Sequence, residues 1–149
     1  GIFWQQLAGL GHDLGHSGVT HIFWLDHLIG SSLASLMGIS TCWWKRNHNT
    51  HHVVCNSVEN DPDIQHMPLL AVTPRVFEKP FWSTYYTKVV AMDSVARFLV
   101  SYQYIVFYPM MMLARFNLYA QSWIQLLAKE PIHYRRTEIC ALGFYMVWV

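Results

Sequence analysis

Charged residues are scarce in this sequence. They occupy 13% of its 149 positions, against about 25% in a typical soluble domain. Hydrophobic residues reach 53%, and this shift towards apolar residues favours a lipid environment. The net charge is only +1, and the sequence has no dense Lys/Arg stripe to neutralise phosphates. It therefore gives no basis for a nucleic-acid-binding protein.

Cysteine is also rare. The three cysteines, Cys42, Cys55 and Cys140, are an odd number and form no C-x-x-C pair. This pattern indicates neither a disulfide framework nor a zinc ribbon. Reduced thiols fit a site that faces the cytosol.

The length of the chain is enough for one domain with a real core. Its first residue is glycine rather than methionine, and residues 139–149 form an apolar run that the end of the sequence interrupts. We therefore expect it to be a piece of a longer protein. Residues 1–11 are apolar apart from two glutamines and are interpreted as the end of a membrane helix.

Histidine is abundant, and five of the nine histidines fall in two short arrays. His12 and His16 form an H-x-x-x-H array, and His48, His51 and His52 form an H-x-x-H-H array. Residues three and four apart lie on one face of a helix. Each array therefore predicts a group of imidazoles that point the same way.

Imidazole chemistry makes these arrays candidates for a metal centre. Neutral imidazole binds zinc, copper, iron and nickel, whereas carboxylates alone favour magnesium or calcium. A histidine cluster with open positions suits iron that must meet dioxygen. The second ring nitrogen of each ligand needs an acceptor. Nearby candidates for that role are Asp13, Asn47, Asn49, Asp61 and Asp63. The four histidines outside the arrays are interpreted as polar side chains near an interface and not as metal ligands. They are His21, His27, His66 and His133.

The segment between the arrays limits the topology. Residues 22–44 are mostly apolar and end in Trp43 and Trp44, which Lys45 and Arg46 follow, an order that marks a lipid–water boundary. A single crossing would separate the arrays by about 30 Å of hydrocarbon, whereas metal–nitrogen bonds are only about 2 Å long. We therefore expect this segment to lie in the interface or to enter and return, with a bend at the glycine and serines of residues 30–32.

The remaining segments are less regular. Residues 53–80 are polar and turn-rich. Residues 59–63 predict either a turn or the start of a helix, which Asp61 would cap with Pro62 at the first helical position. Residues 81–93 show no clear period. Residues 95–114 predict either a kinked membrane span or an interfacial helix that leads into a span starting near Pro109.

After a mixed connection, residues 139–149 open another apolar helix. The predicted fold is an all-α membrane protein. It has transmembrane helices, together with interfacial helices that carry the histidine arrays at the cytosolic face.

Several motifs resemble the membrane fatty-acyl desaturases, in the front-end branch that carries a fused cytochrome b5 domain. They are Trp4-Gln-Gln-Leu, His12-Asp-x-Gly-His16, Trp43-Trp-Lys-Arg-Asn-His-Asn-Thr-His-His52, Asn60-Asp-Pro-Asp-Ile64 and Ser101-Tyr-Gln-Tyr with Tyr108-Pro109. Flanking stretches are similar to those of the fungal delta-8 sphingolipid desaturases. They are Gly15-His-Ser-Gly-Val-Thr-His21, Asp61-Pro-Asp-Ile-Gln-His-Met-Pro68 and Ala114-Arg-Phe-Asn-Leu-Tyr119.

The resemblance implies an oxygen-dependent di-iron desaturase of the endoplasmic reticulum membrane, with its histidine boxes facing the cytosol. Such enzymes remove two hydrogens from adjacent methylenes of a lipid, here an acyl chain or the long-chain base of a ceramide. Electrons come from cytochrome b5 and its NADH-dependent reductase. By matching position, the iron ligands are His12 and His16 of the first box and His48, His51 and His52 of the second. No catalytic residue separate from these ligands is implied. A supporting role falls to Asp13, Asn47, Asp61 and Asp63.

Two family features are missing from the sequence: the third box, Gln-x-x-His-His, and the haem motif His-Pro-Gly-Gly of cytochrome b5. We attribute both to truncation and interpret residues 1–149 as a partial desaturase domain. Because five ligands do not complete a di-iron site, this piece alone is expected to be inactive.

Three alternatives remain open. A membrane di-iron lipid hydroxylase of the same superfamily shares the boxes. A zinc hydrolase would use His12 and His16 in the spacing of H-E-x-x-H, with Asp13 in place of the glutamate, but leaves the second array unexplained. A lipid-binding or scaffolding protein would carry its histidines incidentally.

Overall fold

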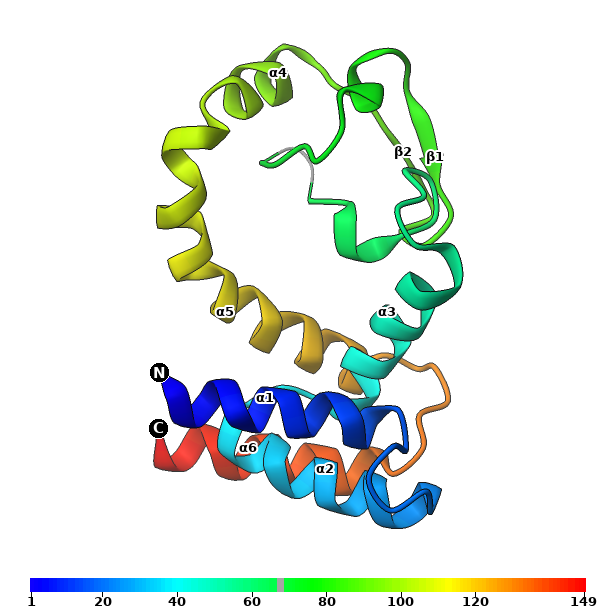
Figure 1. Cartoon of the computed structure of the whole chain (residues 1–149), viewed down its shortest axis with the longest axis vertical. Coiled ribbons are helices and arrows are strands. Elements are labelled where there is room, and N and C mark those ends of the chain that lie inside the picture. Colours follow the sequence, from blue (N-terminus) through cyan, green and yellow to red (C-terminus); the bar gives the residue numbers. More distant parts are fainter. Residues whose placement is uncertain (67–68) are drawn as a thin grey trace. The chain divides into compact units, whose positions relative to one another are not determined.

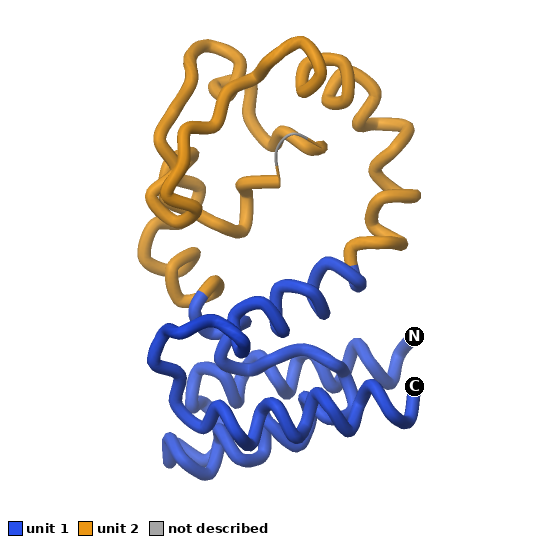
Figure 2. The backbone as a smooth tube through the Cα atoms, turned by 180° about the vertical axis from the view of Figure 1, so that it is seen from behind, with its two compact units in different colours: residues 1–46, 115–149 blue, residues 47–114 orange. Residues whose placement is uncertain are grey.

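The computed structural model describes residues 1–66 and 69–149 and is mostly helical (Figure 1). The chain divides into two compact units (Figure 2): unit 1 comprises Gly1–Arg46 and Arg115–Val149, and unit 2 comprises Asn47–Ala114. The helices are α1 (Ile2–Gly15), α2 (Phe23–Met37), α3 (Thr41–Val54), α4 (Ser94–Ser101), α5 (Gln103–Leu127) and α6 (Arg135–Trp148), with two short 3-10 helices, η1 (Pro62–Ile64) and η2 (Pro74–Phe77). Both α3 and α5 continue from one unit into the other.

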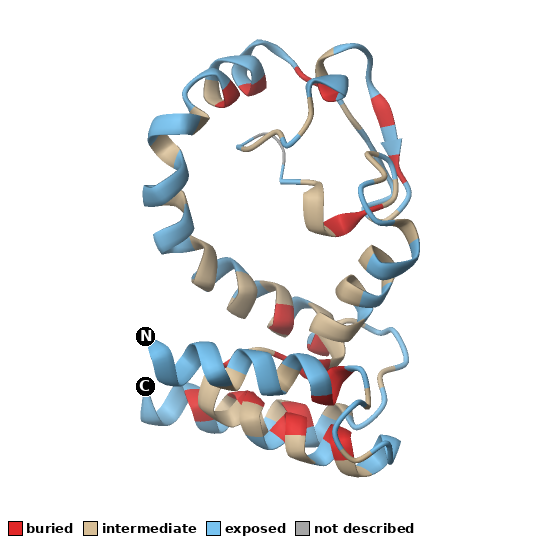
Figure 3. Ribbon diagram, in the orientation of Figure 1, coloured by how far each residue is buried: buried red, intermediate tan, exposed pale blue. Residues whose placement is uncertain are grey.

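Unit 1 is a bundle in which α2 packs against both α1 and α6. Its core contains Ala34 of α2, Leu126 of α5 and Leu142 of α6, all almost fully buried. Burial of such side chains is the main favourable term in folding. Figure 3 shows the buried positions of α2 and α6 among residues that are otherwise half-buried or exposed.

The bend predicted within residues 30–32 is wrong, because α2 runs through them without interruption. The hydroxyl of Ser32 donates a hydrogen bond to the carbonyl of Leu28, one turn back in the same helix, so this polar side chain is satisfied without a break. The helix ends instead at Gly38, whose φ of 74° is the left-handed conformation that favours glycine after a helix.

Unit 2 contains a small sheet, so the all-α prediction is wrong in this detail. Strands β1 (Phe81–Ser83) and β2 (Lys88–Val90) pair antiparallel, with Phe81 opposite Val90. The two strands have three residues each, which is too short for a period of two to be visible in the sequence. The core beside the hairpin consists of Val76, Phe81, Met92, Ala96 and Val100.

The apolar stretch of residues 95–114 is divided between two helices. α4 ends at Ser101, and α5 begins at Gln103 and continues through Pro109, so no helix starts near that proline. In the part of the chain that the structure describes, no helix combines the length and the apolar character needed to cross a bilayer. The helical part of the predicted fold is therefore confirmed, while its transmembrane helices stay a prediction.

Candidate metal centre

The first histidine array lies at the end of α1, in unit 1. The rings of His12 and His16 meet edge to face, with centroids 4.7 Å apart. The indole of Trp44 lies against both rings, with centroid distances of 5.3 Å to His12 and 5.4 Å to His16. Trp44 therefore positions the imidazole pair. Sequence reasoning interpreted this tryptophan only as a marker of the lipid interface.

Gly15 explains how Trp44 approaches the array so closely. A Cβ at this position would lie 2.7 Å from Cε3 of the Trp44 ring, a distance that real Cβ atoms do not show. The motif H-D-x-G-H thus needs glycine at position 15, because the indole of Trp44 leaves no room for a side chain there. Asp13, one of the predicted supporting residues, lies on the exposed side of α1, with its carboxylate 2.9 Å from Nδ1 of His12.

The second array lies on α3, in unit 2, and its three rings do not share one environment. His48 and His52, one turn apart, place their Nε2 atoms 3.0 Å from each other. Two nitrogens bound to one metal at about 2.1 Å and at right angles would also lie about 3.0 Å apart. The spacing of this pair therefore suits two adjacent ligands of one ion.

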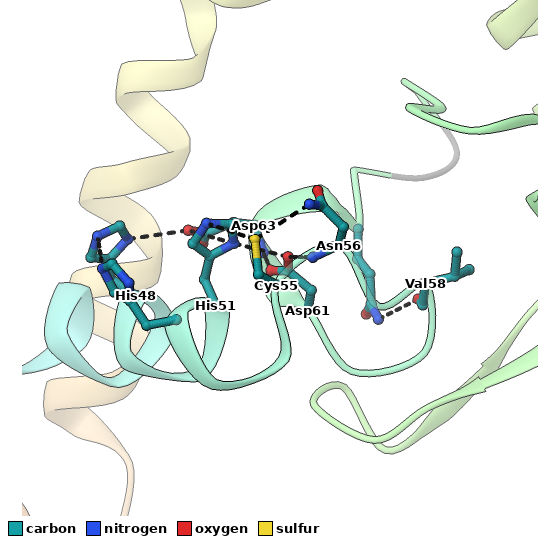
Figure 4. Close-up of polar contacts among 9 residues, drawn as sticks. His48, His51, Cys55, Asn56, Val58, Asp61 and Asp63 are labelled. Carbon is teal, nitrogen blue, oxygen red and sulfur yellow. Dashed lines mark hydrogen bonds and ion pairs between the residues drawn. The ribbon is translucent and has the colours of Figure 1, made fainter.

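His51 faces a different set of groups (Figure 4). Its Nδ1 lies 2.8 Å from the carboxylate of Asp61, which is completely buried. Its Nε2 lies 3.8 Å from Sγ of Cys55, and the donor atoms of His51, Cys55 and Asp61 form a group close enough to hold a metal ion. On the neighbouring turn, Nδ1 of His48 lies 3.3 Å from the carboxylate of Asp63.

Asp61 is held in place by the chain around it. Its Oδ1 accepts a hydrogen bond from the Asp63 N–H and so caps η1, which begins with Pro62 as predicted. Its Oδ2 accepts from the N–H of Asn56, the residue whose left-handed backbone (φ 63°) turns the chain after α3. The same carboxylate therefore caps a helix and faces the histidine.

These contacts also settle the charge of Asp61. Burial by itself raises the pKa of the carboxyl, but hydrogen bonds from the Asn56 N–H, the His51 ring and the Asp63 N–H outweigh it and hold the pKa below its ordinary value. At neutral pH, His51 therefore faces a carboxylate, the partner that fixes the tautomer of a metal-binding histidine.

The other predicted supporting residue, Asn47, has a different partner. Its side-chain oxygen accepts a hydrogen bond from the hydroxyl of Tyr85, in the turn between β1 and β2. This contact joins the start of the second array to the hairpin. Tyr85 was not singled out in the sequence, because only the fold brings it near residue 47.

The donor arrangement fits a metal. Three histidines, His12, His48 and His51, have Nδ1 against a carboxylate. This is the carboxylate–histidine–metal pattern, in which the opposite nitrogen, Nε2, serves as the ligand.

Replacing Asp61 with asparagine is expected to weaken metal binding by about 10–100-fold, the usual effect of losing a partner of a ligating histidine. Asparagine can still cap a helix. Metal affinity should therefore fall more than the stability of the fold. Bound metal per protein, measured by mass spectrometry on the purified full-length protein, checks this.

Asp93→Asn is the matched control for Asp61→Asn. Asp93 caps α4 by accepting from the Ala96 N–H, and no hydrogen bond or ion pair links it to a histidine among the described residues. Equal loss of bound metal in both variants would contradict the role assigned to Asp61.

Comparison with known proteins finds related desaturases. The chain is 43% identical to the delta 8-(E)-sphingolipid desaturase of Lachancea kluyveri, over 99% of this chain and 27% of that protein. It is 44% identical to the acyl-lipid (9-3)-desaturase of Borago officinalis, over 99% of this chain and 33% of that protein. It is 40% identical to the delta(8)-fatty-acid desaturase of Helianthus annuus, over 99% of this chain and 32% of that protein.

The chain thus spans about a quarter to a third of the length of these curated relatives. No solved structure matches it. The family model described as fatty acid desaturase matches residues 1–149. This full-length match and the identities above show that the chain belongs to the fatty acid desaturase family.

Proposed function

We propose that this chain is part of an oxygen-dependent desaturase that introduces the delta-8 double bond into the long-chain base of a sphingolipid. The observation that carries the proposal is the set of histidines with Nδ1 held by carboxylates. The substrate follows from relatives that are named delta 8-(E)-sphingolipid desaturases.

The metal in this proposal is iron, on which the family depends. Its ligands from this chain are His12, His16, His48, His51 and His52, and other ligands come from outside it. When bound, iron supplies with dioxygen the oxidising power to break an unactivated methylene C–H bond, which no side chain can do.

Helix α3 carries both Trp44 and the second array. Trp44, which contacts both His12 and His16, is followed one turn later by His48 and two turns later by His52. Residues four apart on a helix lie on the same face. We propose that both arrays supply ligands to the iron centre, as the resemblance to the family implies.

The carboxylates have defined tasks in this scheme. Asp61 and Asp63 hold the Nδ1 protons of His51 and His48 and so keep Nε2 as the ligand atom. Asp13 does the same for His12. The indole of Trp44 packs on the α1 pair and helps to hold those two rings in place.

The proposal includes a membrane setting and an electron donor. The family is membrane-associated, and large apolar side chains are exposed along α1 and α5, among them Ile2, Phe3, Tyr104, Met112 and Phe116. We place the protein in the endoplasmic reticulum membrane with its histidine boxes towards the cytosol. Cytochrome b5 and its reductase supply electrons there.

The test is expression of the full-length gene in yeast, followed by mass spectrometry of long-chain bases and fatty acids. We expect a new double bond at carbon 8 of the long-chain base, and no product from residues 1–149 expressed alone. A hydroxylated base would instead support the hydroxylase alternative. Unchanged sphingolipids together with a new double bond in acyl chains would contradict the assigned substrate.

A further inference from the structure

A second group of side chains that could hold a metal ion lies inside unit 1 and contains none of the five histidines of the arrays. His27, which the sequence placed outside the metal set, is only 6% exposed. Its Nε2 atom is buried and has no hydrogen-bond partner among the described residues. Buried polar atoms without partners are rare in folded proteins and often indicate an ion or water that completes the site.

The neighbours of this nitrogen are also metal ligands by chemistry. Oε1 of Glu138, a fully buried residue of α6, lies 3.5 Å from His27 Nε2. Cys42, in the first turn of α3, contributes Sγ, and the three donor atoms all lie within 4.8 Å of one another. Three helices of one unit thus point a nitrogen, a sulfur and an oxygen at one another.

The carboxylate and the imidazole are held in position by further contacts. Oε1 of Glu138 accepts a hydrogen bond from the Cys42 N–H at 3.0 Å, and Oε2 accepts one from the hydroxyl of Ser40. The ring of Tyr134 stacks on His27, with centroids 4.6 Å apart. Such support reduces the reorganisation that a bound ion would require.

The donor set and the charges fit zinc. Zinc takes imidazole, thiolate and carboxylate ligands together in tetrahedral sites, with bonds of about 2.0–2.3 Å. Those bonds place neighbouring donors roughly 3.4 Å apart, close to the 3.5 Å between His27 and Glu138. A thiolate and a carboxylate neutralise Zn²⁺, so the complex carries no net charge into the buried site.

We propose that His27, Cys42 and Glu138 bind a zinc ion that ties α2, α3 and α6 of unit 1 together and is separate from the histidine arrays. With three protein ligands, the fourth position of the ion is open to water. A cavity of about 110 Å³ lies beside His27, lined by Trp24, Leu28, Tyr134 and Thr137 as well.

Binding requires the loss of one proton. Burial, together with the Glu138 carboxylate, raises the pKa of the Cys42 thiol to about 12. Zinc therefore displaces the thiol proton to solvent as the Zn–S bond forms.

The test uses the full-length protein purified in detergent and loaded with zinc alone, with X-ray absorption at the zinc edge as the readout. We expect a sulfur neighbour at about 2.3 Å. Cys42→Ser should remove this neighbour and lower bound zinc by one equivalent. The matched control, Cys140→Ser, should keep both, because Cys140 lies in no group of candidate metal ligands among the described residues.

A second variant keeps the test decisive if Cys42→Ser does not fold. His27→Gln should lose the same zinc equivalent, while His66→Gln, at an exposed histidine, should not. The proposal is overturned if wild-type protein shows no sulfur neighbour. It is also overturned if a folded Cys42 or His27 variant retains it, or if Cys55→Ser is the change that removes it.

Discussion

Alanine in place of His48 is expected to reduce the desaturated product by roughly 100-fold or more, and bound iron with it. Losing a partner hydrogen-bonded to a ligand already costs about 10–100-fold, and His48 is itself a proposed ligand. Its Nε2 lies 3.0 Å from that of His52, and its Nδ1 lies against Asp63. The full-length variant, expressed in yeast, is checked by product analysis and by iron per purified protein.

His66→Ala is the matched control for His48→Ala. His66 also belongs to unit 2, but it is exposed and lies in no metal-binding group among the described residues. This variant should keep both iron and product. If His48→Ala retained wild-type product levels, the second array would not be the oxidising centre, and the lipid-binding alternative would gain support.

The sequence was most informative where the spacing of residues on one helix carries the chemistry. The H-x-x-H-H spacing predicts neighbouring rings on α3, and the structure places His48 and His52 in contact. Asp61 with Pro62 predicts a capped helix, and η1 has that cap. In both cases the interacting groups lie within a few residues of each other, so the local backbone alone brings them together.

Contacts between distant segments could not be predicted in this way. Trp44 was interpreted as an interface marker, because nothing in the sequence shows that its ring packs on residues of α1. Cys42 and Glu138 are 96 positions apart, and only the packing of unit 1 joins them. His27 was excluded as a lone histidine for the same reason.

The wrong prediction of a bend in α2 shows how reasoning from local propensity can fail. Glycine and serine at residues 30–32 favour a bend by intrinsic propensity, yet α2 continues through them. Gly30 instead provides close packing, because a Cβ there would lie 3.3 Å from the side chain of Thr41. The glycine that ends the helix is Gly38, and its role depends on side chains from α5 and α6.

Gly38→Ala is expected to destabilise unit 1 by about 2–5 kcal/mol. A left-handed conformation costs a residue with a Cβ roughly 1–2 kcal/mol, and overpacking a core adds about 1–3 kcal/mol. The new Cβ would lie 2.5 Å from Cδ1 of Tyr145 and 2.9 Å from Cε1 of Tyr119. These two tyrosines share a hydrogen bond of 2.6 Å, and Arg115 links them to α2 by donating to both Tyr119 and the Met37 carbonyl. Moving either ring therefore disturbs the junction of α2, α5 and α6.

Gly143→Ala is the matched control, because it makes the same substitution at a position with room for the added methyl group. Gly143 lies within α6, and apart from its chain neighbours and the backbone of its own helix no heavy atom of the described residues would come within 4 Å of the new Cβ. Because alanine favours a helix over glycine by about 0.8–1.0 kcal/mol, this variant should be slightly more stable than wild type. Thermal unfolding of the full-length variants in detergent measures both changes. If Gly38→Ala unfolded at or above the wild-type temperature, the packing of Tyr119 and Tyr145 around the end of α2 would be wrong.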